Sequence, residues 1–262
     1  MRIIVILRRV LDPAGIVAHR RLRRLFVNRE EYILQPADRC ALEAALRIKE
    51  TSDAEVVVVS GQPEPSDDTL RRGLAMGADR AIYLSGESFD NADDAVVVRA
   101  LRAAIEQLGG ADVVLSGMAT LDTGQGQLGI RLAEALGWPQ IVGAWSVEAA
   151  NGHLQAVRRD GDKYVLVEAD LPATVTVQPG ALKPRYANGV RLINIFRGEG
   201  EIAEALEQWD VADLLAPDDL APLLESRGHD FPPERKRGER VEGAPEEMAR
   251  TVADALRQRL RG

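Results

Sequence analysis

The chain has 262 residues, and its 33 Lys and Arg against 41 Asp and Glu give a formal net charge of −8. This acidic balance excludes a non-specific nucleic-acid binder, which needs a basic surface, and the single cysteine excludes an internal disulfide. No apolar run approaches the roughly 18 residues of a membrane-spanning helix, so we expect no membrane span and a soluble, cytoplasmic protein.

The first half of the chain alternates short apolar runs with amphipathic segments. Short apolar runs are typical of buried parallel strands, whereas apolar residues that recur every turn indicate helices. We expect strands over residues 3–7, 55–60, 81–84 and 113–115, and helices over 36–49, 67–76, 92–108 and 128–136. Residues 8–34 lack clean periodicity and predict an irregular excursion or a hairpin. Its basic cluster at 19–24 (HRRLRR) is a solvated loop or a partner contact.

The alternation of strand and helix patterns ends beyond residue 140. Residues 145–157 and 164–169 predict a β-hairpin turned at 159–162, and residues 173–177 predict another strand. Together these patterns predict an α/β fold with a mostly parallel, doubly wound sheet and antiparallel strands at one edge. We expect this domain to occupy residues 1–197. The proline-rich remainder predicts an extended C-terminal arm that ends in a helix and packs on this domain or on a partner chain.

The stretch from Ala111 to Trp138 is the most informative part of the sequence. A short apolar strand is followed by a glycine-rich loop and by an amphipathic helix that begins near Leu128. Unpaired amides at a helix N-terminus bind phosphate well, although an ordinary tight strand–helix turn has the same pattern. The loop also contains the spacing GxGxxG, but no acidic residue follows about 20 positions later to hold a ribose. That absence counts against an NAD-dependent dehydrogenase.

Patterns typical of catalytic and metal sites are absent from the sequence. His19, His153 and His229 lie far apart, and none is at ligand spacing from another histidine or from the cysteine. There is no GxSxG elbow and no Walker A motif. The acidic pairs at 67–68 and 93–94 are explained as helix starts. The sequence therefore predicts a nucleotide-binding scaffold without catalytic residues of its own.

Several segments, taken in order, resemble one family. The N-terminal strand is followed by two arginines and an aspartate, and the sequence QPAD precedes the first helix. The matching segments are residues 3–12, 35–50, 69–84, 111–140, 183–186 (KPRY) and the end of the C-terminal arm. Over essentially its whole length the chain resembles the β subunits of electron transfer flavoproteins, the family that includes FixA.

The resemblance implies an adenine-nucleotide α-hydrolase-like (Rossmann-like) fold and a heterodimer with an α subunit that holds most of the FAD. The arm, residues 198–262, would pack on that subunit. The nucleotide-binding domain, residues 1–197, would hold a structural AMP or, as in bifurcating members, a second FAD. The chain would not be an enzyme itself. It would carry electrons from a dehydrogenase to an acceptor such as a quinone oxidoreductase. A stand-alone nucleotide-binding sensor is the remaining alternative.

The resemblance also implies site residues. Gln35 and Asp38 would face the base or ribose, and the amides of the glycine-rich loop would receive the phosphate. The full cofactor set is Ile6, Gln35, Pro36, Ala37, Asp38, Gly61, Asp122, Thr123, Gly124, Gln125, Gly126, Gln127, Leu128 and Gly129. A partner-docking loop would include Ala181, Leu182, Arg185 and Tyr186.

Two departures of the loop from the common AMP-type sequence D-D-x-N-Q-T-G remove side-chain hydrogen-bond donors. Gly126 and Leu128 stand where an asparagine and a threonine supply side-chain donors. Losing two neutral hydrogen bonds costs roughly 1 kcal/mol each, which would weaken AMP binding. The smaller side chains would equally leave room for the diphosphate of FAD, so both nucleotides remain candidates, with AMP preferred.

Overall fold

The computed structural model describes residues 1–61, 67–89, 92–150, 152–225, 231–232, 238 and 240–260. Most strands join one sheet. They are β1 (Arg2–Ile6), β6 (Glu55–Gly61), β7 (Arg80–Ser85), β8 (Val113–Gly117), β9 (Gln140–Ala150), β10 (His153–Asp160), β11 (Lys163–Asp170), β12 (Ala173–Val177) and β13 (Leu206–Asp210). Their order across the sheet is β11-β10-β9-β12-β8-β1-β6-β7-β13. The pairs from β9 through β12 to β13 are parallel, whereas β9, β10 and β11 pair antiparallel, as the sequence predicted.

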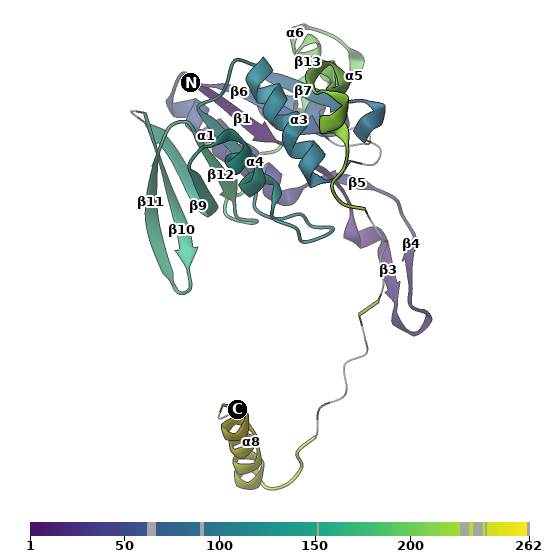
Figure 1. Ribbon diagram of the computed structural model, residues 1–262, viewed down its shortest axis with the longest axis vertical. Coiled ribbons are helices and arrows are strands. Elements are labelled where there is room, and N and C mark those ends of the chain that lie inside the picture. Colours follow the sequence, from purple (N-terminus) through teal and green to yellow (C-terminus); the bar gives the residue numbers. More distant parts are fainter. Residues whose placement is uncertain are drawn as a thin grey trace.

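Helices cover both faces of this sheet (Figure 1). The larger ones are α1 (Pro36–Thr51), α2 (Asp67–Met76), α3 (Asp94–Gln107), α4 (Leu128–Leu136) and α5 (Gly189–Arg197). Strand residues alternate between two cores, because successive side chains of a strand point to opposite faces. Ile3 and Val5 pack with α1 and α2, while Ile4 and Ile6 pack with α3 and α4. The fold is therefore a doubly wound α/β domain.

The strand order reverses beside β1. From β1 the chain moves outward to β6 and β7, then crosses back through α3 to place β8 on the other side of β1. At such a point the loops leaving the two neighbouring strands diverge toward opposite faces, and a crevice opens outside their carboxyl ends. The glycine-rich loop follows β8 directly. The topology thus brings that loop to the crevice beside the end of β1.

The excursion after β1 is a small β-structure, as expected. β2 (Arg9–Leu11) pairs with β5 (Tyr32–Leu34), and between them β3 (Ile16–His19) and β4 (Arg24–Val27) form a hairpin. In Figure 1 this hairpin, drawn in purple, projects away from the sheet. The basic cluster at 19–24 occupies its tip, where all six residues are exposed.

The expected antiparallel hairpin is a three-stranded structure instead. The segment 145–157 was predicted as one strand, but a turn around Gly152 divides it between β9 and β10. Gly152 has a φ of +82°, a conformation that glycine adopts without strain. The turn predicted at 159–162 is confirmed, because Asp160 pairs with Lys163 across it.

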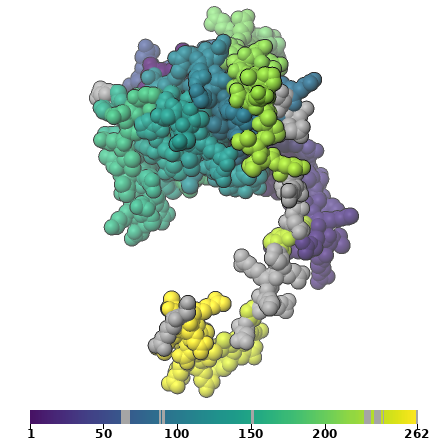
Figure 2. Space-filling model, viewed as in Figure 1, coloured from purple at the N-terminus to yellow at the C-terminus, as the bar shows by residue number. Residues whose placement is uncertain are grey.

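The segment after residue 197, expected as an extended arm, contributes one strand to the sheet. α6 (Glu201–Glu204) leads into β13, which pairs in parallel with β7 and forms one edge of the sheet. α7 (Val211–Leu214) and the 3-10 turn Pro217–Leu220 then return over α3, with Val211 fully buried. α8 (Pro245–Leu260) has no buried residue, and Figure 2 shows it in yellow, apart from the main body. His229 and most of the charged run at 234–239 lie outside the described residues.

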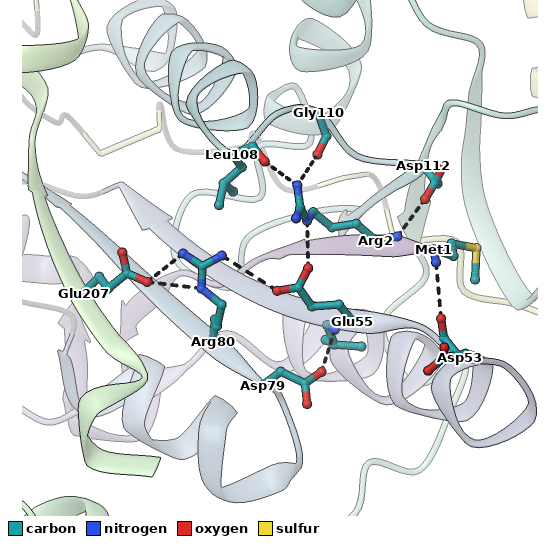
Figure 3. Close-up of polar contacts among 11 residues, drawn as sticks. Met1, Arg2, Asp53, Glu55, Asp79, Arg80, Leu108, Gly110, Asp112 and Glu207 are labelled. Carbon is teal, nitrogen blue, oxygen red and sulfur yellow. Dashed lines mark hydrogen bonds and ion pairs between the residues drawn. The ribbon is translucent and has the colours of Figure 1, made fainter. Parts of the chain in front are cut away.

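Charged side chains link neighbouring strands at the end of the sheet where its parallel strands begin (Figure 3). Arg80 donates to Glu207 at 2.7 Å and lies 3.7 Å from Glu55, so it joins the edge strand β13 to β6. Glu55 also accepts a 2.8 Å hydrogen bond from Arg2. Arg2 in turn donates to two carbonyl oxygens just beyond the end of α3. This network connects four strands and the end of α3 at the end of the sheet opposite the crevice.

Asp93 is the N-cap of α3 and also fixes the segment that follows the 3-10 turn. One carboxylate oxygen accepts from the amides of Ala95 and Val96, and the other accepts from Leu223 and Leu224 at 2.8 and 2.9 Å. Burial of Asp93 favours protonation, but these four amides outweigh it and lower the pKa of the carboxyl group.

Replacing Asp93 by alanine should lower the free energy of unfolding by about 1–2 kcal/mol, the usual cost of a lost N-cap. The same change should release residues 216–225, so that proteases cut there sooner than in the wild type. Limited proteolysis with mass spectrometry measures the second effect. Asp93→Asn retains an acceptor oxygen and should give intermediate values. Equal cleavage of the alanine variant and the wild type would rule out this anchoring role.

Candidate functional site

A cleft of about 240 Å³ lies at the crevice predicted by the strand order. Its lining residues come from the ends of β1 and β6, the glycine-rich loop, and the first turns of α3 and α4. They are Ile6, Arg8, Gly61, Ala92, Asp94, Val97, Thr120, Asp122, Thr123, Gln125, Gln127 and Leu128. In a parallel sheet the strands end where the following helices begin. Helix N-termini and their partial positive charge therefore face this cleft.

The glycine-rich loop is held in shape by its own hydrogen bonds. The amide of Thr120 donates to the carbonyl of Gln125 at 2.9 Å, and the amide of Gly124 donates to the carbonyl of Thr120 at 3.1 Å. The hydroxyl groups of Thr120 and Thr123 are 2.7 Å apart, and both residues line the cleft. The loop thus presents two hydroxyl groups on a preformed turn.

Two glycines allow this loop to lie close to the sheet. A Cβ atom on Gly126 would lie 2.4 Å from the carbonyl oxygen of Met118, and one on Gly129 would lie 2.5 Å from the hydroxyl of Ser116. Gly124 has a φ of +70°, which any other residue would adopt only with strain. The close approach places the first turn of α4 directly against β8.

The N-terminus of α4 has no side-chain cap. Its N-cap residue, Gln127, makes no side-chain hydrogen bond to the first turn. The first amides of an α-helix have no partner within the helix, so an uncapped start leaves donors available to an anion. Gln127 and Leu128 line the cleft, which places these donors at its wall.

A buried ion pair between Arg8 and Asp38 lies beside the cleft, and Arg8 is the member that lines it. Both oxygens of Asp38 accept from the Arg8 guanidinium, at 2.6 and 2.9 Å, and they also accept from the amides of Arg8 and Gly117. Asp38 is fully buried, and the Arg8 side chain is 10% exposed. Burial opposes the charged form of Arg8, but the Asp38 carboxylate outweighs it and raises the pKa of the guanidinium.

These contacts differ from the role expected for Asp38. Described residues of the chain itself donate four hydrogen bonds to Asp38, and Asp38 is not among the residues that line the cleft. Gln35 is also buried. Its amide nitrogen donates to the carbonyl of Ala119, while no described residue bonds to its side-chain oxygen, Oε1. Gln35 thus has one buried acceptor without a partner among the described residues, but like Asp38 it does not line the cleft, and Asp38 positions Arg8.

The remaining predicted residues divide into three groups. Ile6, Gly61, Asp122, Thr123, Gln125, Gln127 and Leu128 line the cleft. Gly124, Gly126 and Gly129 shape its loop, while Ala37 is buried and Pro36 lines a different cleft. The sequence did not single out Arg8, Ala92, Asp94, Val97 or Thr120 as cofactor residues. The signal for three of these was their position at the start of a predicted helix, which a parallel sheet places beside the strand ends.

The expected docking loop is only partly at the surface. Ala181 and Leu182 are half-buried and pack against the core below α1, whereas Tyr186 is 85% exposed. Arg185 donates to Glu43 at 2.8 Å and to Glu50 at 2.7 Å, so it fastens the loop to α1. Burial of Glu43 favours protonation, but hydrogen bonds from Arg185 and Arg47 outweigh it and lower the pKa of Glu43.

This lowered pKa gives a testable pH dependence. Because the folded-state pKa of Glu43 lies below its ordinary value of 4.5, its stabilising effect is complete above that pH. The effect is lost as the pH falls through the folded-state value. Urea unfolding of the wild type and Glu43→Gln should give a constant stability difference between about pH 7 and pH 5, which narrows below about pH 4.5. A difference that stays constant down to about pH 3 would contradict this assignment.

Among the described residues, no helix is both long and apolar enough to cross a membrane, and no cluster of three metal-ligating side chains occurs.

Comparison with known proteins identifies one family. Residues 24–214 match the model of the electron transfer flavoprotein domain. The electron transfer flavoprotein subunit beta of Methylophilus methylotrophus is 33% identical over 87% of this chain and 86% of its own length.

Two further relatives align over nearly their full length. The acryloyl-CoA reductase electron transfer subunit gamma of Anaerotignum propionicum is 28% identical, with 99% of both chains covered. The caffeyl-CoA reductase-Etf complex subunit CarD of Acetobacterium woodii is 29% identical, again with 99% of both chains covered.

Proposed function

The chain belongs to the electron transfer flavoprotein family as a β subunit, and from that premise we propose that its cleft binds a structural AMP while a partner α subunit holds most of the FAD. FAD supplies the redox chemistry of such a complex. The role of this chain is to bind the structural AMP and to help orient and cover the FAD. The observation that carries the proposal is the uncapped N-terminus of α4 at the wall of the cleft beside β1 and β8.

The groups around the cleft fit an adenine nucleotide. The first amides of α4, the hydroxyl groups of Thr120 and Thr123, and the Arg8 guanidinium are donors suited to phosphate oxygens. Asp94 and Asp122 are acceptors suited to ribose hydroxyl groups. The phosphate and the ribose of AMP thus have complementary partners among the lining residues.

The size of the cleft favours AMP over a second FAD. Its volume of about 240 Å³ lies below the roughly 300–1,000 Å³ of a typical small-molecule or cofactor site, so a ligand as large as FAD fits least well. FAD carries a second phosphate, a ribityl chain and a three-ring flavin in addition to the AMP portion. We therefore retain the second FAD, and with it a bifurcating role, as the alternative.

We assign two surfaces to partners. Along α8, Val252, Leu256 and Leu260 are 49%, 57% and 86% exposed at a spacing of four residues, which forms one apolar stripe. This stripe suits packing on the α subunit. Tyr186 and, on α5, Val190 and Ile193 form a second exposed apolar surface. It suits docking of the dehydrogenase that donates electrons or of the acceptor, for which a quinone oxidoreductase is the natural class.

Nucleotide analysis of the heterodimer tests the proposal. The chain is co-expressed with its α subunit, the purified complex is denatured, and the released nucleotides are quantified by chromatography. One FAD and one AMP per heterodimer is the expected result. Two FAD and no AMP would establish the alternative. No flavin and no stable complex would overturn the proposal and favour a stand-alone nucleotide sensor. Neither that role nor an NAD-dependent dehydrogenase is favoured by the relatives.

A further inference from the structure

A second and larger cleft, of about 630 Å³, lies outside the proposed nucleotide site. It is enclosed by β5, the first turns of α1, the C-terminal half of α2 and the loop 180–187. Most of its wall is apolar, with Leu34, Met76, Leu182 and Pro184 among the lining residues. Its volume is within the roughly 300–1,000 Å³ typical of small-molecule sites.

Two arginines supply the charge of this cleft. Arg39 lies on α1 and Arg72 on α2, and none of the described residues that line the cleft is acidic. Arg39 makes a single long hydrogen bond of 3.4 Å, to the carbonyl of Arg185, and Arg72 bonds to no described residue. Neither forms an ion pair with a carboxylate in the described part of the chain.

Two carboxylates of α1 are already engaged by other arginines. Glu43 accepts from Arg185 and Arg47, and Glu50 accepts from Arg185. In a chain with a net charge of −8, two guanidinium groups without a carboxylate partner therefore share one largely apolar cavity. Guanidinium groups match carboxylate, sulfonate and phosphate oxygens through paired N–H donors.

We propose that this cleft binds a small organic anion, a molecule with one anionic group on a mainly apolar or aromatic body. The anionic group interacts with Arg39 and Arg72, while the apolar body packs against Met76 and Leu182. Tyr186, which is 85% exposed, lines the cleft as well, so a bound ligand contacts the surface assigned above to redox partners. None of the described residues lines both this cleft and the nucleotide cleft.

A pair of naphthalene dyes tests the proposal. The anionic dye 8-anilinonaphthalene-1-sulfonate has the required chemistry, and N-phenyl-1-naphthylamine is its neutral counterpart. Each is titrated into the full-length chain in complex with its α subunit, and binding is followed by fluorescence. The double variant Arg39→Gln/Arg72→Gln should bind the anionic dye about tenfold or more weakly, because each arginine loses a charge-assisted hydrogen bond. Its affinity for the neutral dye should be unchanged.

The controls separate this site from general effects. Arg158→Gln/Arg159→Gln removes the same charge from β10, far from the cleft in sequence and outside its lining, and should leave both affinities unchanged. The nucleotide content of Arg39→Gln/Arg72→Gln should equal that of the wild type, which distinguishes failure here from failure of the proposed function. Equal binding of the anionic dye by this variant and the wild type would overturn the proposal. Absence of anionic-dye binding by the wild-type complex would also overturn it, since a protein surface would then cover the cleft.

Discussion

Replacing Arg8 by methionine should lower the free energy of unfolding by about 3–5 kcal/mol, the largest stability effect that we expect from a single substitution in this chain. Methionine retains the apolar stem but leaves the fully buried Asp38 carboxylate without its cation. The amides of Arg8 and Gly117 would still donate to Asp38, but they carry no net charge. Urea or thermal unfolding, followed by circular dichroism, measures the change.

A double-mutant cycle identifies the cause of this loss. Asp38→Asn alone should also be strongly destabilising, because Arg8 then becomes a buried cation without a partner. The double variant Arg8→Met/Asp38→Asn should be less destabilised than the sum of the two single changes, since neither charge remains. Arg21→Met, at the exposed tip of the β3–β4 hairpin, makes the same chemical change at a solvated site and should shift stability by under about 0.5 kcal/mol. Additive losses in the cycle would show that the pair does not act as a unit.

Replacing Gly126 by alanine should reduce the nucleotide retained by the purified heterodimer about tenfold or more. The added Cβ would lie 2.4 Å from the carbonyl oxygen of Met118, which belongs to the backbone and cannot move aside as a flexible side chain would. The loop between β8 and α4 must therefore shift, and with it Thr120, Thr123 and the amides at the start of α4. The measurement is nucleotide released on denaturation, per mole of complex.

Gly189→Ala is a matched control for this prediction. Gly189 begins α5, and a Cβ atom there would meet no atom within 4 Å. This variant should keep the wild-type nucleotide content. Full nucleotide retention by Gly126→Ala would show that the loop does not hold the nucleotide, and the proposed phosphate site would have to move elsewhere.

The sequence was sufficient to predict the central strands and their helices. Segments such as 55–60 are apolar on both faces because helices cover both sides of the sheet, and a short apolar run between turn residues is typical of such a strand. The edge strands were harder to predict from the sequence. β13 reads LEQWD, with polar residues at the solvent face of an edge strand, and it resembles the end of an amphipathic helix. The sequence between β9 and β10 contains the dipeptide Asn151-Gly152, a strong hairpin signal that the prediction of a single strand over 145–157 did not use.

The site shows a similar division between local and long-range information. The glycine-rich loop and α4 are contiguous, so their arrangement follows from local sequence. The partners of Arg8 are not contiguous, since Asp38 lies 30 residues away and Gly117 lies 109 residues away. Nothing in the segment QPAD distinguishes a carboxylate that binds a ribose from one that holds an arginine. Only the topology, which places α1 behind the ends of β1 and β8, decides between them.

The position of β13 also determines when this protein can finish folding during its synthesis. Its partner β7 leaves the ribosome early, yet Leu206 pairs with Ala81, roughly 125 residues earlier in the chain. Until then β7 is an unprotected edge, and unpaired strand edges invite association between nascent chains. The ion pair between Arg80 and Glu207, which joins these two strands, can form only after residue 207 has been synthesised. A ribosome stalled before residue 206 would therefore carry a chain in which β7 is still an open edge.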